Sequence, residues 1–208
     1  MMKPMEKRAF IIGNGSSRKD FDLMYLKDKG TVFGCNALYR KFRPNYDLPD
    51  YLVAIDDKII TEIESSDFPS KRFIVPPKDE QYEPFEIHWK KNGKPGLTSR
   101  SNAGVNAMLE AIKMGYKQLF MLGFDSMIVD NKVALSNLFD GTNAYEENTR
   151  ASLVDTRNRL DYIGWLIEKH EDVDFVFVYP EKNKSYQPLI RNSYRNNLEE
   201  LKKLLENH

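Results

Sequence analysis

The chain has 208 residues, 41% of them hydrophobic, which is enough apolar material for one substantial core without requiring a second domain. Its 31 Lys and Arg residues balance 31 Asp and Glu residues, so the basic excess that nonspecific nucleic-acid binding needs is absent. Cys35 is the only cysteine, which excludes an intramolecular disulfide and a cysteine-based zinc site and favours a reducing, cytoplasmic setting.

The chain begins with charged residues, and no segment is apolar over the length that a signal peptide or a membrane span requires. We therefore expect any membrane contact to be peripheral.

The short apolar run Arg8 to Ile12 predicts a buried first strand. Ser16 or Ser17 is expected to cap a helix through residues 22–26. Thr31 to Cys35 predicts the second strand.

The pattern then continues with shorter elements. A short helix is expected over residues 37–42 and a third strand over Tyr51 to Ile55. Asp56 or Asp57 is placed to cap the following helix, and a fourth strand is expected over Arg72 to Val75.

Residues 78–97 are rich in Pro, Lys and Glu and are predicted to form an insertion over the rim of the sheet. Ser99 or Ser101 is expected to open a helix that ends at Gly115. Gln118 to Leu122 is the most apolar strand of the chain.

Residues 126–152 have no clear period, and long connections of this kind are usually functional, so this segment is a candidate lid. A helix over residues 153–169, a last strand over residues 174–179 and a closing helix over residues 194–206 follow. The alternation predicts one domain over residues 1–208: an α/β, Rossmann-like three-layer sandwich with a mostly parallel sheet and a long lid-like loop.

Four polar motifs stand where predicted strands end, and in a parallel sheet such ends share one edge. We therefore expect the motifs to converge on one ligand crevice. They are Gly13-Asn14-Gly15-Ser16-Ser17, Gly34-Cys35-Asn36, Ile55-Asp56-Asp57 and Gly123-Phe124-Asp125-Ser126.

The first motif has the form of a glycine-rich phosphate turn, in which Gly13 and Gly15 let the backbone approach an anion and Asn14 and Ser16 donate to it. It lacks both the full dinucleotide fingerprint and the lysine of a P-loop. The alternative is a tight turn with an ordinary serine cap. A second anion-binding candidate, or an ordinary capped helix start, is the segment around Ser101 and Asn102.

The other motifs also have two interpretations. Asn36 can present an amide to a sugar or a base, whereas Cys35 is interpreted as a core residue. Asp56 and Asp57 fit either Mg²⁺ binding or helix capping. Asp125 follows a buried strand and needs partners such as ribose hydroxyls, a metal or backbone groups. The three histidines do not cluster in the sequence and are interpreted as surface residues.

The order of these motifs resembles the bacterial sialyltransferases that use CMP-sialic acid. The resemblance covers roughly residues 8–125 and rests on Gly-Asn-Gly-Ser-Ser, Gly-Cys-Asn-Ala-Leu-Tyr and the segment from Ser101 to Asp125. It implies that CMP is bound by Asn14, Ser16 and Asn36 and that Ser101 and Asn102 help to hold the donor.

The resemblance further implies an inverting displacement without a metal, with a histidine base and with tyrosines that stabilise the phosphate leaving group. Tyr145, together with Tyr162, is the candidate for the tyrosine role. Residues 126–152 contain no histidine, so the family's base has no counterpart there.

The chain is also similar to the 6-hydroxymethylpterin diphosphokinase-like proteins, through the glycine-rich turn and Pro49-Asp50-Tyr51-Leu52-Val53-Ala54-Ile55-Asp56. That similarity makes Asp56 and Asp125 the residues for Mg²⁺ and pyrophosphate.

The favoured hypothesis is a glycosyltransferase that moves a sugar from a CMP-type donor to a glycan acceptor and needs no cofactor. In it Asp125 and Tyr145 are the catalytic candidates and Asp56 joins the nucleotide-binding set. A Mg²⁺-dependent pyrophosphokinase and a non-catalytic nucleotide- or glycan-binding protein are the alternatives.

Overall fold

The parallel sheet that the sequence predicts is present. The computed structural model describes residues 7–77, 102–125, 128–129, 132–133, 137–145, 153–180 and 193–206. Seven strands form one sheet in the order β4-β3-β2-β1-β5-β8-β9, and all neighbours run parallel. The strands are β1 (Arg8–Ile12), β2 (Thr31–Cys35), β3 (Tyr51–Val53), β4 (Phe73–Ile74), β5 (Gln118–Leu122), β8 (Asp174–Tyr179) and β9 (Ser193–Asn197).

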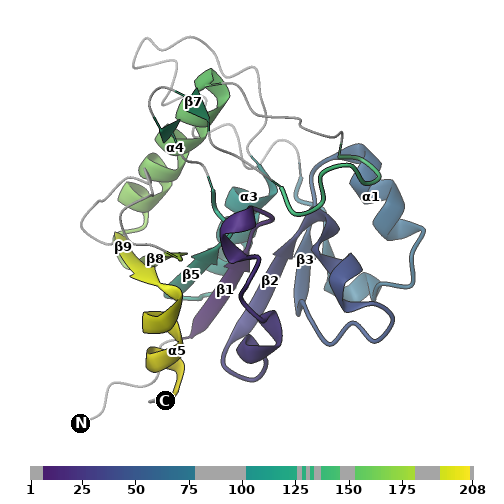
Figure 1. Cartoon of the computed structure of the whole chain (residues 1–208), viewed down its shortest axis with the longest axis horizontal. Coiled ribbons are helices and arrows are strands. Elements are labelled where there is room, and N and C mark those ends of the chain that lie inside the picture. The colour runs from purple at the N-terminus through teal and green to yellow at the C-terminus, as the bar shows by residue number, and fades with distance from the viewer. Residues whose placement is uncertain are drawn as a thin grey trace.

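Helices lie on both faces of this sheet (Figure 1). None of the helices in the described ranges has the length and apolar character needed to cross a membrane. The α-helices are α1 (Asp57–Glu64), α3 (Ala103–Lys113), α4 (Leu153–Lys169) and α5 (Leu198–Glu206), and the 3₁₀ helices are η1 (Ser16–Arg18), η2 (Leu23–Leu26), η3 (Asn36–Phe42) and η4 (Ser70–Arg72).

Successive residues of each strand face opposite sides of the sheet, so the sheet carries two separate cores. In β1, Ala9 and Ile11 pack with α3 and α4, whereas Phe10 and Ile12 pack with η2, η3, α1 and α5. All four of these side chains are fully buried. The α/β three-layer sandwich predicted from the sequence is therefore confirmed.

The strand order places a topological switch point between β1 and β5, because the chain continues from β1 toward β4 on one side and returns to β5 on the other. Two glycines allow the strand ends to meet there. A Cβ atom on Gly13 would lie 2.6 Å from the backbone oxygen of Gly123, and Gly123 itself has a φ of +73°. In open α/β sheets, such a switch point is where ligands usually bind.

The first predicted helix differs from the observed structure. Residues 16–26 contain only η1 and η2, and neither Ser16 nor Ser17 caps them. Asp22 caps η2 instead, through a 3.0 Å hydrogen bond from the backbone N–H of Met24. The side chain of Ser17 bonds instead to Asp125 at the switch point.

The end of the chain also differs. The strand over residues 174–179 is not the last, because residues 193–197 form β9 and α5 begins only at Leu198. The sequence Ser-Tyr-Arg-Asn-Asn carries no apolar run, and an edge strand bonded on one side does not require one. An apolar pattern alone therefore missed this strand.

The bounds of most other strands and helices can be compared directly with those predicted from the sequence. Strands β1, β2, β5 and β8 and helix α4 have the predicted bounds, whereas β3 and β4 are shorter than expected. The predicted insertion at 78–97 and the serines proposed to cap the next helix lie outside the described residues. Asn102 is the N-cap of α3, since its Oδ1 accepts a 3.0 Å hydrogen bond from the N–H of Val105.

The candidate lid is described in parts. It contains the short antiparallel pair β6 (Ile128–Val129) and β7 (Lys132–Val133) and the segment 137–145, which we call the strap. That the whole chain forms a single domain stays a prediction.

Candidate functional site

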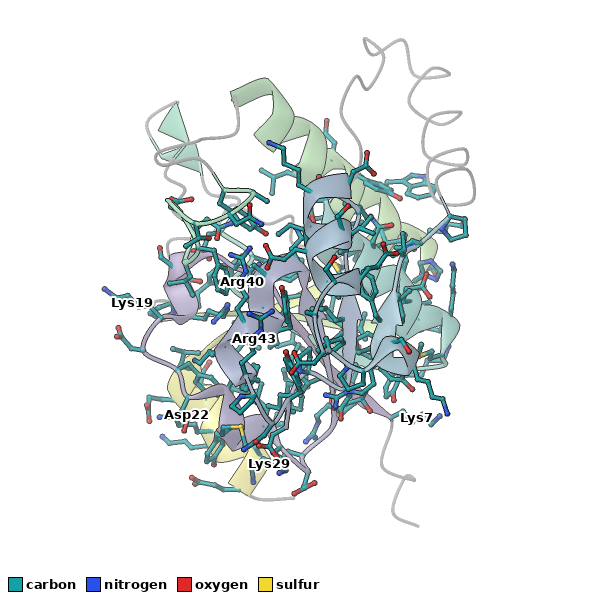
Figure 2. The ribbon with its side chains drawn as sticks, turned by 90° about the vertical axis from the view of Figure 1, so that its right-hand side faces the viewer. Lys7, Lys19, Asp22, Lys29, Arg40 and Arg43 are labelled. Carbon is teal, nitrogen blue, oxygen red and sulfur yellow. The ribbon has the colours of Figure 1, made fainter. Side chains whose placement is uncertain are left out.

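The carboxyl edge of the sheet brings the predicted motifs together. The turn after β1, Asn36 after β2, Asp56 after β3 and Asp125 after β5 all follow adjacent parallel strands in register. Figure 2 labels Lys7 and Lys29, which precede β1 and β2 at the opposite edge, and Arg40, which lies toward the carboxyl edge. Ser101, also predicted for this site, lies outside the described residues.

Asn14 ties the ends of two strands together. Its Nδ2 donates to the backbone oxygen of Cys35 at 2.9 Å, and its Oδ1 accepts from Arg18 at 3.1 Å. The side chain is 9% exposed. Asn14 therefore has a structural role at the switch point, and its contact with a nucleotide stays a prediction.

Arg18 is a buried cation that the sequence analysis did not single out. Its side chain is 2% exposed, and its Nε donates to the backbone oxygen of Gly13 at 2.5 Å. Burial lowers the pKa of Arg18 to about 10, so the guanidinium keeps its charge at neutral pH. The one feature of the sequence that could have indicated Arg18 is its position directly after the small-residue turn at 13–17.

Asp125, after β5, is hydrogen-bonded to the turn that follows β1. Its carboxylate accepts a 2.8 Å hydrogen bond from the backbone N–H of Ser17 and a second from the Ser17 hydroxyl. Burial raises the pKa of Asp125, while the bonds from Ser17 and the charge of Arg18 oppose the shift. A Cβ atom on Gly15 would lie 2.3 Å from the Asp125 carboxyl carbon, so only glycine fits there. The catalytic role predicted for Asp125 stays a prediction.

Asn36 and Asp56 form the next pair along the edge. Asn36 adopts a left-handed conformation with a φ of +50°, and its Nδ2 donates to Asp56 at 3.3 Å. Asp56 is exposed and stands at the N-cap of α1 without a side-chain capping bond. Its carboxylate is therefore available at the site.

The strap crosses this edge from the turn after β1 to α1, where it is the green segment of Figure 1. Asn137 forms an antiparallel bridge with Gly15, and the N–H of Leu138 donates to the backbone oxygen of Asn14 at 2.8 Å. Further along, Arg40 donates to the strap at Thr142 and Asn143. The strap is thus attached at both of its ends.

Tyr145 ends the strap beside Asn36. Its hydroxyl oxygen and Oδ1 of Asn36 are both buried, and neither makes a hydrogen bond of regular geometry with any described residue. Burial raises the pKa of Tyr145 to about 12, although the Asn36 amide and the backbone N–H of Ala37 face the hydroxyl closely enough to lower it in part. Tyr145 therefore stays a neutral hydrogen-bond donor at neutral pH.

Three other candidates lie away from this pair or are engaged elsewhere. Tyr162 lies on α4, is 4% exposed and packs into the core between α4 and the sheet. The Oδ1 of Asn102 caps α3. Ser16 begins a helix of only three residues, so the extended helix start expected to bind phosphate is not present after this turn.

Neither the cysteine nor the described histidine suggests a catalytic base. Burial raises the pKa of Cys35 to about 12, which keeps it a thiol and confirms it as a core residue. His170 follows α4 and precedes β8, at the amino edge of the sheet and away from the predicted site.

The two aspartates that the pyrophosphokinase resemblance assigns to Mg²⁺ and pyrophosphate stand far apart. The ends of β2 and β1 separate Asp56 from Asp125, which at about 4.8 Å per strand places their backbones roughly 14 Å apart. Ligands of one Mg²⁺ ion lie at about 2.0–2.1 Å from it. The pair therefore does not form a shared metal site, and no group of three metal-ligating side chains gathers elsewhere in the described residues.

A cavity of about 510 Å³ lies at the opposite, amino edge of the sheet, lined in part by Thr31, Tyr51 and Tyr116. Its charged groups are largely paired within the protein. Lys27 bonds to Asp47 at 2.8 Å, Asp50 accepts the N–H of Val32, and Arg72 donates to backbone oxygens of residues 46, 49 and 50. This cavity does not coincide with the predicted site.

Comparison with known proteins gives the fold a context. The chain resembles the monofunctional alpha-2,3-sialyltransferase Cst-I from Campylobacter jejuni, with a TM-score of 0.55 and 15% identity over 85% of this chain and 77% of that one. It also resembles the MAf glycosyltransferase from Magnetospirillum magneticum AMB-1, with a TM-score of 0.53 and 16% identity over 94% of this chain but only 34% of that one. No family model and no curated protein matches the sequence. At this identity the likeness shows that the chain shares the fold of these proteins.

Proposed function

We propose that this protein is a glycosyltransferase that takes a sugar from a CMP-type donor, with the nucleotide bound at the carboxyl edge between the β1 turn and Tyr145. The observation that carries the proposal is the pair of buried polar atoms, Asn36 Oδ1 and the Tyr145 hydroxyl, which have no regular hydrogen-bond partner among the described residues. Buried polar groups of this kind are rare without a ligand or water to satisfy them.

The chemistry of the two atoms fits such a donor. Asn36 Oδ1 is an acceptor for an amino or hydroxyl group of cytidine, and the neutral Tyr145 hydroxyl is a donor for a phosphate oxygen. The sequence resemblance to CMP-sialic acid-dependent sialyltransferases and the fold shared with Cst-I support the same assignment.

In the proposed reaction an acceptor hydroxyl oxygen attacks the anomeric carbon of the donor sugar. The new C–O bond forms as the bond from that carbon to the phosphate oxygen breaks, and the electron pair stays on the phosphate. A hydrogen bond from Tyr145 stabilises the charge that develops there. The acceptor loses its proton to a base, and Asp56 is the exposed carboxylate that the described residues offer beside Asn36.

Calorimetric titration tests this proposal. CMP, UMP and ATP are titrated with EDTA and then with Mg²⁺, against the wild type, Asn36→Gly and Tyr145→Phe. Glycine preserves the positive φ at position 36 while it removes the amide. We expect CMP to bind best without metal and both variants to weaken it at least tenfold. Binding of ATP that requires Mg²⁺ would support the pyrophosphokinase alternative instead, and CMP binding without turnover would support a non-catalytic protein.

A further inference from the structure

One arginine holds two structural units at once. Arg40 on η3 makes a two-pronged ion pair with Glu62 on α1, with Nε to Oε1 at 2.7 Å and Nη2 to Oε2 at 2.6 Å. The same guanidinium donates to the strap, from Nη1 to the Thr142 hydroxyl at 2.8 Å and from Nη2 to the backbone oxygen of Asn143 at 2.9 Å. Figure 2 shows Arg40 next to the strap.

Glu62 contributes from the other side. It accepts a hydrogen bond from the Asn143 amide and another from the Tyr39 hydroxyl. The side chains of Arg40 and Glu62 are only 17% and 19% exposed, so this pair is shielded more than an ordinary surface salt bridge. Bidentate arginine–carboxylate geometry is also the strongest and most directional form of such a pair.

The closed strap buries two polar groups whose hydrogen bonding is incomplete. Asn36 Oδ1 and the Tyr145 hydroxyl lie buried beside its end without a regular hydrogen bond. Buried polar groups with incomplete hydrogen bonding cost free energy, even though the Asn36 amide and the Ala37 N–H lie close to the Tyr145 hydroxyl, so they favour opening of the strap when no ligand is present. The contacts of Arg40 and Glu62 act against that opening.

We infer that Arg40 and Glu62 form a latch that holds the strap closed over Asn36 and Tyr145, so that a ligand reaches these two atoms only when the latch releases. The inference rests on the proposed function for the identity of the ligand. Arg40 and Glu62 are positioning residues in this account, because they act on the strap and on Tyr145 and do not touch the reacting atoms.

Amide hydrogen exchange of the full chain without ligand tests the latch directly. In Arg40→Gln we expect the amides of Leu138 and Tyr145 to exchange about tenfold faster, because opening of the strap becomes easier. The amides of β1 and β5 should be unchanged. Lys27→Gln breaks an ion pair at the amino edge, where both side chains are more than 40% exposed, and serves as the matched control with no effect on the strap.

A second variant separates the latch from general stability. Thr142→Val combined with Asn143→Ala removes the side chains of the strap that contact Arg40 and Glu62 while it leaves their ion pair intact. It should also increase exchange of the strap alone. If Arg40→Gln speeds amide exchange throughout the sheet, the double variant is the deciding test. Strap exchange in the double variant that equals that of the wild type overturns the inference.

Rapid-mixing measurements with CMP give the functional readout. An easier opening should raise the association rate of CMP in Arg40→Gln and raise its dissociation rate by more, so that affinity falls. An association rate equal to that of the wild type contradicts gating by the latch. If CMP does not bind the wild type, the proposed function fails, whereas the exchange result still judges the latch.

Discussion

Replacing Asn14 by alanine separates a structural tie from a ligand contact. The side chain makes two buried hydrogen bonds, to the Cys35 oxygen at 2.9 Å and from Arg18 at 3.1 Å. Truncation leaves the carbonyl and the charged donor without these partners, at roughly 1–3 kcal/mol for each buried group left unpaired. Since Asn14 lies near the rim and water can reach part of the gap, we expect a total loss of about 2–4 kcal/mol.

For a protein of 150–250 residues, 1 kcal/mol shifts Tm by about 2–4 °C, so Asn14→Ala should lower Tm by roughly 5–15 °C. Thermal unfolding followed by circular dichroism measures this shift. Asn36→Gly is the control, because its amide makes a long bond of 3.3 Å to Asp56 and an irregular contact with the Tyr145 hydroxyl, and its loss should change Tm by less than about 3 °C. An Asn14→Ala protein with an unchanged Tm would refute the tie between β1 and β2.

Three further predictions concern the same edge. Gly13→Ala places a Cβ atom 2.6 Å from the Gly123 oxygen, and we expect a loss of about 1–3 kcal/mol in denaturant unfolding; a stability equal to that of the wild type would show that the two turns can move apart freely. Asp125→Asn keeps an oxygen to accept the Ser17 N–H, so it should fold and bind CMP, and loss of CMP binding in a protein with normal Tm would show instead that the carboxylate contacts the nucleotide. The bonds from Arg40, together with those from Tyr39 and Asn143, lower the pKa of Glu62 to about 2 despite burial, so its contribution is present above the unfolded value of about 4.3 and is lost as the pH falls from there toward 2. Pepsin should therefore cut the strap faster, relative to a model peptide, at pH 2 than at pH 4, and Glu62→Gln should remove that pH dependence.

The sequence predicted the central strands because they are apolar and end at glycine or at a polar motif. It predicted the carboxyl edge as the site for the same reason, since parallel strands must end together. Gly13 and Gly123, which permit the close approach at the switch point, were both among the motifs. The regular, buried part of the fold was therefore accessible from the pattern alone.

What the sequence did not predict depends on contacts between distant residues. Arg40 and Glu62 are 22 positions apart on different helices, and each resembles an ordinary surface charge until the fold pairs them. Ser17 was expected to cap a helix, but its hydroxyl bonds to Asp125, 108 positions away. The polar strand β9 has no apolar pattern because it lies at an edge of the sheet. In each case tertiary context overrides the local preference.

A crystal structure of the protein soaked with CMP tests the central claim most directly. The account predicts the nucleotide at the carboxyl edge, with a phosphate oxygen within hydrogen-bond distance of the Tyr145 hydroxyl and a cytidine donor on Asn36 Oδ1. CMP bound instead in the cavity at the amino edge, beside Tyr51 and Tyr116, would contradict it.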